Sequence, residues 1–114
     1  MTASAASNGT LEHAFDSSPV SVVVVNYNAG DLLRECLGSA LEQAAEVIVV
    51  DNASEDGSVY GLKMSHFAEL RIKIICNSEN LGFSAGCNIG FRQAQEDHIL
   101  FLNPDCRLSS GAVT

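Results

Sequence analysis

The sequence predicts an α/β fold, built as a doubly wound and mostly parallel sheet. The first observation is that four short apolar runs, rich in β-branched residues and too short for helices, recur along the chain: 20–25, 47–50, 72–76 and 99–102. The second is that three stretches with helical spacing or helix-start signals separate these runs: 31–43, 58–70 and 83–94. Strands that alternate with helices form parallel sheets with right-handed crossovers.

The first strand, Val20 to Val25, follows Pro19 and ends at the polar segment Asn26-Tyr27-Asn28. In the helix that follows, Asp31 to Gln43, apolar residues recur every three or four positions and form one stripe. We expect Asp31 to be the N-cap of this helix.

The second strand, Val47 to Val50, also ends in polar residues, Asp51 and Asn52. A helix from Ser58 to Leu70 and a third strand from Ile72 to Cys76 come next. Lys73 interrupts the apolar pattern of the third strand, which favours a position near the edge of the sheet.

The third predicted helix, Phe83 to Ala94, contains Gly86 and Gly90. A glycine inside a helix costs roughly 1 kcal/mol relative to alanine. We expect the compensation to be close approach of the helix backbone to a ligand or to a neighbouring strand.

The fourth strand, Ile99 to Leu102, is an unbroken apolar run, which favours burial on both faces of the sheet. Pro104 ends the strand because it lacks an N–H, so Asp105 follows at the carboxyl end, where open α/β sheets bind ligands. A carboxylate there would suit Mg²⁺ or Mn²⁺ sharing its coordination with phosphate oxygens. The alternative is that Asp105 only caps a turn.

Composition limits the class of function. The chain has 114 residues, of which 46% are hydrophobic, and a formal net charge of −8. We expect a disordered leader over residues 1–18 and one folded domain over residues 19–114. The negative charge disfavours a nucleic-acid partner but does not disfavour a single nucleotide. The sequence shows neither a signal peptide nor a run of roughly 20 apolar residues, which favours a cytoplasmic location.

Three of the four strands end in Asn and Asp, and parallel strands direct these ends to one side of the sheet. Convergent polar groups of this kind predict a small-ligand site. No GxGxxG or P-loop motif follows the first strand, which disfavours dinucleotide and P-loop binding. A phosphoacceptor module built on Asp51 would want acidic residues where Asn26 and Asn28 stand, and a purely structural domain remains a third alternative.

Four motifs carry a family resemblance. They occur in order over residues 20–108: VVVVNYN (22–28), VIVVDNASEDGS (47–58), NLGFSAGCNIG (80–90) and LFLNPD (100–105). The chain resembles the inverting GT-A glycosyltransferases of family 2, particularly their rhamnosyltransferase-like branch. The resemblance implies a GT-A, nucleotide-diphospho-sugar transferase-like fold and a sugar-nucleotide site.

The resemblance also implies roles for individual residues. Asp51 would accept a hydrogen bond from a pyrimidine base, Asp105 would ligate Mg²⁺ or Mn²⁺ that bridges the diphosphate, and Gly86 would help the backbone approach the nucleotide. The implied nucleotide-binding set is Asn26, Asn28, Asp51, Asn52, Gly82, Asn88 and Asn103. Within it, Asn26 and Asn28 would line the base pocket, and Asn103 would lie near the ribose or the waters of the metal.

The implied reaction is transfer of a hexosyl or deoxyhexosyl group from a dTDP- or UDP-linked donor to a cell-envelope glycan or lipid-linked acceptor. The family's catalytic domain is about twice as long, so we expect a truncated, donor-binding half whose general base lies beyond Thr114. The alternative is a non-catalytic nucleotide-binding or assembly module. We also expect an exposed sheet edge at the fourth strand, open to an oligomer or partner chain, and peripheral contact with the inner membrane surface.

Overall fold

The computed structural model describes residues 2–3, 18–63, 71–109 and 111–112. Its elements are β1 (Thr2–Ala3), β2 (Ser18–Asn26), α1 (Asp31–Leu41), β3 (Ala44–Asp51), α2 (Ser58–Lys63), β4 (Ile72–Cys76), α3 (Phe83–Gln93) and β5 (His98–Leu102). The four predicted strands and three predicted helices are all found. Residues 64–70 of the second predicted helix, and all of the predicted leader except Thr2–Ala3 and Ser18, lie outside the described residues. The described parts of the leader belong to strands.

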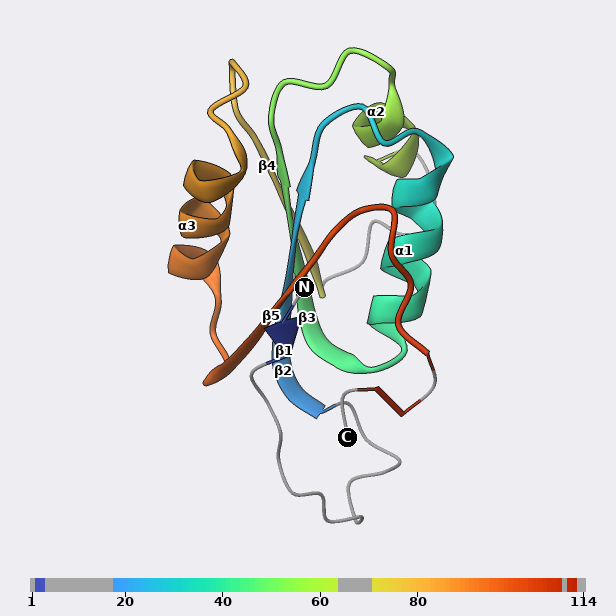
Figure 1. Cartoon of the computed structure of the whole chain (residues 1–114), viewed down its shortest axis with the longest axis vertical. Helices are drawn as coiled ribbons and strands as arrows, with labels where there is room; N and C mark the ends of the chain where they lie inside the picture. Colours follow the sequence, from blue (N-terminus) through green and yellow to red (C-terminus); the bar gives the residue numbers. More distant parts are fainter. Residues whose placement is uncertain (1, 4–17, 64–70, 110, 113–114) are drawn as a thin grey trace.

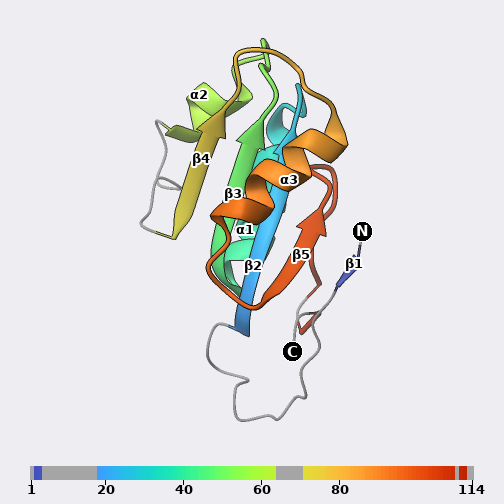
Figure 2. The ribbon, with the colours of Figure 1, turned by 90° about the vertical axis from the view of Figure 1, so that its left-hand side faces the viewer.

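The five strands form one sheet in the order β1-β5-β2-β3-β4. Strands β5, β2, β3 and β4 run parallel, and β1 pairs antiparallel with β5 (Figure 2). The predicted edge position of the strand that contains Lys73 is confirmed. The first long strand, β2, lies between β3 and β5, so the order of strands reverses there and creates the switch point at which such sheets bind ligands.

Helices cover both faces of the sheet, which confirms the doubly wound arrangement. Helices α1 and α2 lie on one face and α3 lies on the other (Figure 1). The main core lies between α1 and the sheet, with Leu33 and Leu37 of α1 packed among alternate residues of the strands. A smaller core under α3 contains Val23, Val25 and Ile48.

The two glycines of α3 face β2. A Cβ atom on Gly86 would lie 2.7 Å from Cγ1 of Val25, and one on Gly90 would lie 2.4 Å from Cγ1 of Val23. Both separations are too short for carbon atoms. The expected close approach is therefore made to the neighbouring strand β2.

The predictions for the fourth strand, β5, need two corrections. Leu100 and Leu102 are buried, but Ile99 and Phe101 are only half-buried, because α3 packs over β2 and β3 and leaves this face of β5 partly open. The outer edge of β5 is also not uncovered, since Thr2 pairs with Phe101 and Ala3 with Leu100.

The start of α1 differs from the prediction as well. Its N-cap is Gly30, and Asp31 is the first residue of the helix. Gly30 has a φ of 61°, a conformation that favours glycine, and its N–H donates to Oδ2 of Asp56 at 2.9 Å. No helix among the described residues is long and apolar enough to cross a membrane.

Candidate functional site

The polar residues at the carboxyl ends of three strands lie along the same side of the sheet. Asn26 at the end of β2 pairs in register with Asp51 at the end of β3, and Val24 pairs with Leu102 of β5, so Asn103 and Asp105 follow on the other side of β2. Neighbouring strands are about 5 Å apart, so the ends of β3 and β5 are separated by roughly 10 Å. We call this side of the sheet the carboxyl rim.

A buried hydrogen-bond network occupies the centre of the carboxyl rim. Nδ2 of Asn26 donates to Oδ1 of Asp51 at 2.8 Å and lies 3.1 Å from the hydroxyl oxygens of both Ser54 and Ser58. Asp51 also accepts from the hydroxyl of Ser54 at 2.7 Å and from its backbone N–H at 3.0 Å. The carboxylate of Asp51 is thus already largely engaged by the protein.

The side-chain oxygen of Asn26 has no such partner. Among the described residues it is the one buried side-chain oxygen or nitrogen atom without a hydrogen bond. A buried acceptor left without a donor costs about 1–3 kcal/mol. The protein therefore leaves an unmet acceptor directly beneath the carboxyl rim.

Asn28 joins the loops that follow β2 and β3. Its backbone N–H donates to the hydroxyl of Ser54 at 2.8 Å, and its Oδ1 accepts from the N–H of Glu55 at 2.8 Å. Asn28 adopts a positive φ of 53°, which asparagine tolerates better than most residues. Ser54 and Ser58 were not predicted as site residues, although the segment after Asp51 contains both serines and is typical of such loop contacts.

Asn52 performs a different task from the one implied by the resemblance. Its side chain is buried, donates to the carbonyl oxygen of Gly82 at 3.1 Å and accepts from Nδ2 of Asn77 at 2.8 Å. These bonds tie the end of β3 to the loop before α3. In the described structure Asn52 holds this loop and contributes no free polar atom to the carboxyl rim.

Gly82 and Asn88 are not brought to the centre of the site. Gly82 is the N-cap of α3 with a φ of 92°, and a Cβ atom there would meet nothing within 4 Å, so its backbone conformation explains the glycine and no close contact does. Asn88 is exposed, half a helical turn away from Gly86 and Gly90, which face the sheet. It therefore lies on the outer face of α3.

Asn103 and Asp105 belong to a turn at the end of β5. The N–H of Cys106 donates to the carbonyl oxygen of Asn103 at 3.0 Å, which closes a turn with Pro104 and Asp105 in its centre. The thiol of Cys36 donates to the same carbonyl oxygen at 3.5 Å. Burial, together with the nearby Cys106 and Asp105, raises the pKa of Cys36 to about 12, so this thiol keeps its proton at neutral pH.

The donor set at this turn fits a hard divalent cation only with further ligands. Asn103 and Asp105 are both exposed and offer an amide oxygen and a carboxylate. No group of three or more His, Cys, Asp or Glu residues suited to a metal occurs in the described part of the chain. Mg²⁺ is commonly held by one or two carboxylates plus substrate phosphates, and this donor set matches that pattern.

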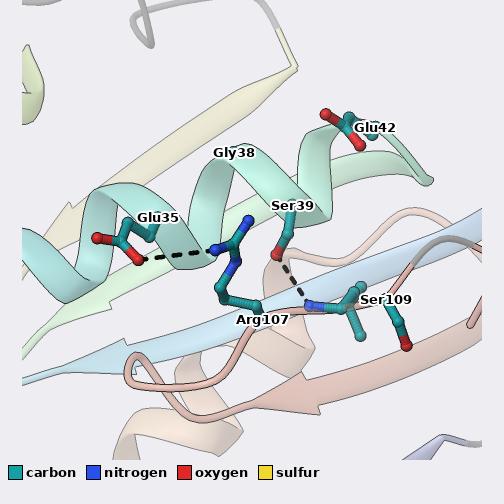
Figure 3. Close-up of a pocket in the computed structure, with 7 residues that line it drawn as sticks. Glu35, Gly38, Ser39, Glu42, Arg107 and Ser109 are labelled. Carbon is teal, nitrogen blue, oxygen red and sulfur yellow. Dashed lines mark hydrogen bonds and ion pairs between the residues drawn. The ribbon is translucent and has the colours of Figure 1, made fainter.

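Two cavities flank the site without including Asp51 or Asp105. One, of about 110 Å³, lies between the loops after β2 and β3 and is lined by Gly30, Asp31, Leu33, Arg34, Asp56, Gly57 and Ser58. The other, of about 620 Å³, lies along α1 (Figure 3). On the carboxyl rim the half-exposed Tyr27 follows β2.

Comparison with known proteins identifies glycosyltransferases as relatives. TuaG of Bacillus subtilis, named for teichuronic acid biosynthesis, is 33% identical over 89 residues, which cover 75% of this chain and 35% of TuaG. The glycosyltransferase AglE of Haloferax volcanii is 32% identical over 92 residues, or 76% of this chain and 30% of AglE. The chain thus spans about a third of the length of these relatives.

Solved structures give the same result. TarS of S. aureus (1–349), in complex with UDP-GlcNAc, superimposes with a TM-score of 0.66 at 28% identity, over 75% of this chain and 26% of TarS. The mannosyltransferase PcManGT from Pyrobaculum calidifontis, in complex with GDP-Man and Mn²⁺, gives 0.68 at 25% identity, over 80% and 30%. These neighbours confirm the GT-A fold. The model of the glycosyl transferase family 2 matches residues 21–114, and the chain belongs to that family.

Proposed function

We propose that this chain forms the donor-binding part of a glycosyltransferase that uses a dTDP- or UDP-linked sugar. One observation carries the proposal. Because β2 lies between β3 and β5, the buried pair Asn26–Asp51 and the exposed Asp105 share one rim. The end of β3, which bears Asp51, and the end of β5, which Asp105 follows, are roughly 10 Å apart, which is the scale of a nucleoside diphosphate. The complexes of TarS with UDP-GlcNAc and of PcManGT with GDP-Man support this reading.

The base would bind beside Asp51. Oδ1 of this carboxylate accepts two hydrogen bonds and Oδ2 accepts one, so Oδ2 keeps one lone pair for an N–H of a pyrimidine. Asn28 borders the same position.

The diphosphate would lie toward β5. Asp105 would hold Mg²⁺ or Mn²⁺, with Asn103 near its waters, and the ion would neutralise charge on the departing diphosphate. The Mn²⁺ in the PcManGT complex supports a divalent ion in general. We propose residues 19–114 as the donor-binding part, and place the acceptor site and general base beyond Thr114.

The acceptor would be a cell-envelope glycan or a lipid-linked acceptor, and the teichuronic acid in the name of TuaG supports a glycan. A nucleotide-binding module without transfer activity is the second candidate, because the chain spans only about a third of its relatives. Both candidates require the same donor site, so binding is the first property to test.

Calorimetric titration with UDP and dTDP, with and without Mn²⁺, tests the site. Wild-type protein should bind at least one of them more tightly with Mn²⁺. Asp105→Asn should abolish the increase in nucleotide affinity that Mn²⁺ produces, because it removes the charged ligand. Asp97→Asn makes the same change on an exposed residue before β5, at the opposite edge of the sheet, and should leave the gain intact. Absence of any binding by wild-type protein would refute the proposal.

A further inference from the structure

The turn that carries Asp105 is attached to α1 by the chain that follows it. We call residues 103–109 the strap. After β5 the strap crosses to the face of the sheet covered by α1 and runs along that helix (Figure 1). The position of Asp105 therefore depends on how firmly the strap is held.

Three residues of α1 and the turn after it hold the strap at successive helical turns. The thiol of Cys36 donates to the carbonyl oxygen of Asn103, and the hydroxyl of Ser39 accepts from the N–H of Leu108 at 3.0 Å. Nε2 of Gln43 donates to the carbonyl oxygen of Ser109 at 2.7 Å. Positions 36, 39 and 43 share one helix face, so the strap follows a single track.

Ser39 is the buried anchor of this track. Its hydroxyl donates to the carbonyl oxygen of Cys36 at 2.8 Å while it accepts from Leu108, and its side chain is only 8% exposed. By contrast, the ion pair between Arg107 and Glu35 spans 3.9 Å and both side chains are largely exposed (Figure 3). Exposed pairs of this kind contribute little, so Ser39 should matter more than Arg107.

We propose that Ser39 is a positioning residue for the metal ligand Asp105. This inference rests on the proposed function. With one carboxylate in the protein's donor set, the affinity for a metal–diphosphate pair depends on how well that carboxylate is preorganised. Ser39 restrains the strap three residues beyond Asp105, as Cys36 does two residues before it. Without Ser39, ordering the strap becomes part of the cost of binding the metal.

The experiment compares nucleotide affinity with and without Mn²⁺ in Ser39→Ala, Arg107→Ala and wild-type protein. Hydrogen exchange of the Leu108 amide reports directly on the strap without metal or nucleotide. We expect Ser39→Ala to accelerate this exchange and to reduce the gain from Mn²⁺ by roughly three- to tenfold, the range for one hydrogen bond of ordinary strength. Affinity for the nucleotide without Mn²⁺ should stay the same, and Arg107→Ala should change none of these values.

Two outcomes would overturn the inference. One is faster exchange at Leu108 with an unchanged gain from Mn²⁺, and the other is an equal loss of affinity with and without Mn²⁺, which indicates a general structural role. If wild-type protein shows no gain from Mn²⁺ at all, the proposed metal site itself fails. Ser39→Cys keeps most of the side-chain volume with a weaker acceptor and should give an intermediate loss, which keeps the test readable if Ser39→Ala unfolds.

Discussion

The amide of Asn26 donates a 2.8 Å hydrogen bond to the carboxylate of Asp51, and the two side chains are 0% and 4% exposed. This bond joins neighbouring strands at the point where both end. The carboxylate that would recognise the base is therefore fixed in place by its partner on β2. Under the proposed function, a substitution at this pair changes both the stability of the protein and its affinity for the nucleotide, so variants must be compared for both.

Replacing Asn26 by alanine should lower the free energy of unfolding by about 2–4 kcal/mol, because a buried carboxylate loses its amide donor. Urea unfolding at pH 7 measures this change. Asn88→Ala, on the exposed face of α3, should stay within about 0.5 kcal/mol of wild type. Equal effects of the two substitutions would contradict the buried bond.

Replacing Ser54 by alanine should weaken binding of the nucleotide with and without Mn²⁺, by roughly three- to tenfold. The hydroxyl of Ser54 contacts Asp51 and the backbone of Asn28, so its loss should loosen both sides of the base pocket. Calorimetry gives the affinities. Ser78→Ala, at an exposed bend before α3, is the matched control, and a similar loss there would count against the assignment.

Gly90→Ala should destabilise the protein by about 1–3 kcal/mol, although alanine is the better helix former, because its methyl group would overlap Val23. Val23→Ala makes room for that methyl group. The loss of stability in the double variant should therefore be smaller than the sum of the two single losses, by about 1 kcal/mol or more. Additive losses in urea unfolding would show that α3 relaxes away from β2 instead.

The ionisation of Glu46 should make the free energy of unfolding depend on pH in the acid range. Burial acts to raise the pKa of this carboxyl, but hydrogen bonds from Ser21 and Gln95, both 2.6 Å long, and the charge of Lys73 hold it below its ordinary value. A lowered pKa means that the unfolded chain binds the proton more tightly. The stabilisation is thus complete above the ordinary value, roughly pH 4.3, and is lost as the pH falls through the lower folded pKa.

Glu46→Gln should accordingly be less stable than wild type at pH 7, and the difference should shrink as the pH falls below about 4. Urea unfolding across this range measures it. Glu42→Gln, at an exposed position after α1, should leave the pH profile of wild type unchanged. A difference between Glu46→Gln and wild type that is constant with pH would refute the assignment.

Local patterns predicted four parallel strands and their shared rim, because apolar runs and their polar ends report directly on burial. They predicted neither β1, which lies in the expected leader, nor the order of the strands in the sheet. Patterns could not predict that Asn52 serves the neighbouring loop, since its partners Asn77 and Gly82 become neighbours only after β4 is placed. The same holds for the strap, whose residues after Cys106 show no regular spacing. The glycines Gly86 and Gly90 indicated a close backbone approach, but the sequence did not distinguish a ligand from a strand, and only the structure shows that both glycines face β2.

The pairing of β5, which is made late, with β2, which is made early, has a consequence for how the protein folds on the ribosome. The side-chain hydrogen bonds of Asn26 and Asp51 all have their partners between residues 26 and 58, so the proposed base side can form while the second half of the chain is still being made. The proposed phosphate side, which contains Asp105, can form only after β5 has paired with β2 on the side away from β3. A nascent chain should therefore acquire nucleoside recognition before it acquires any response to divalent ions.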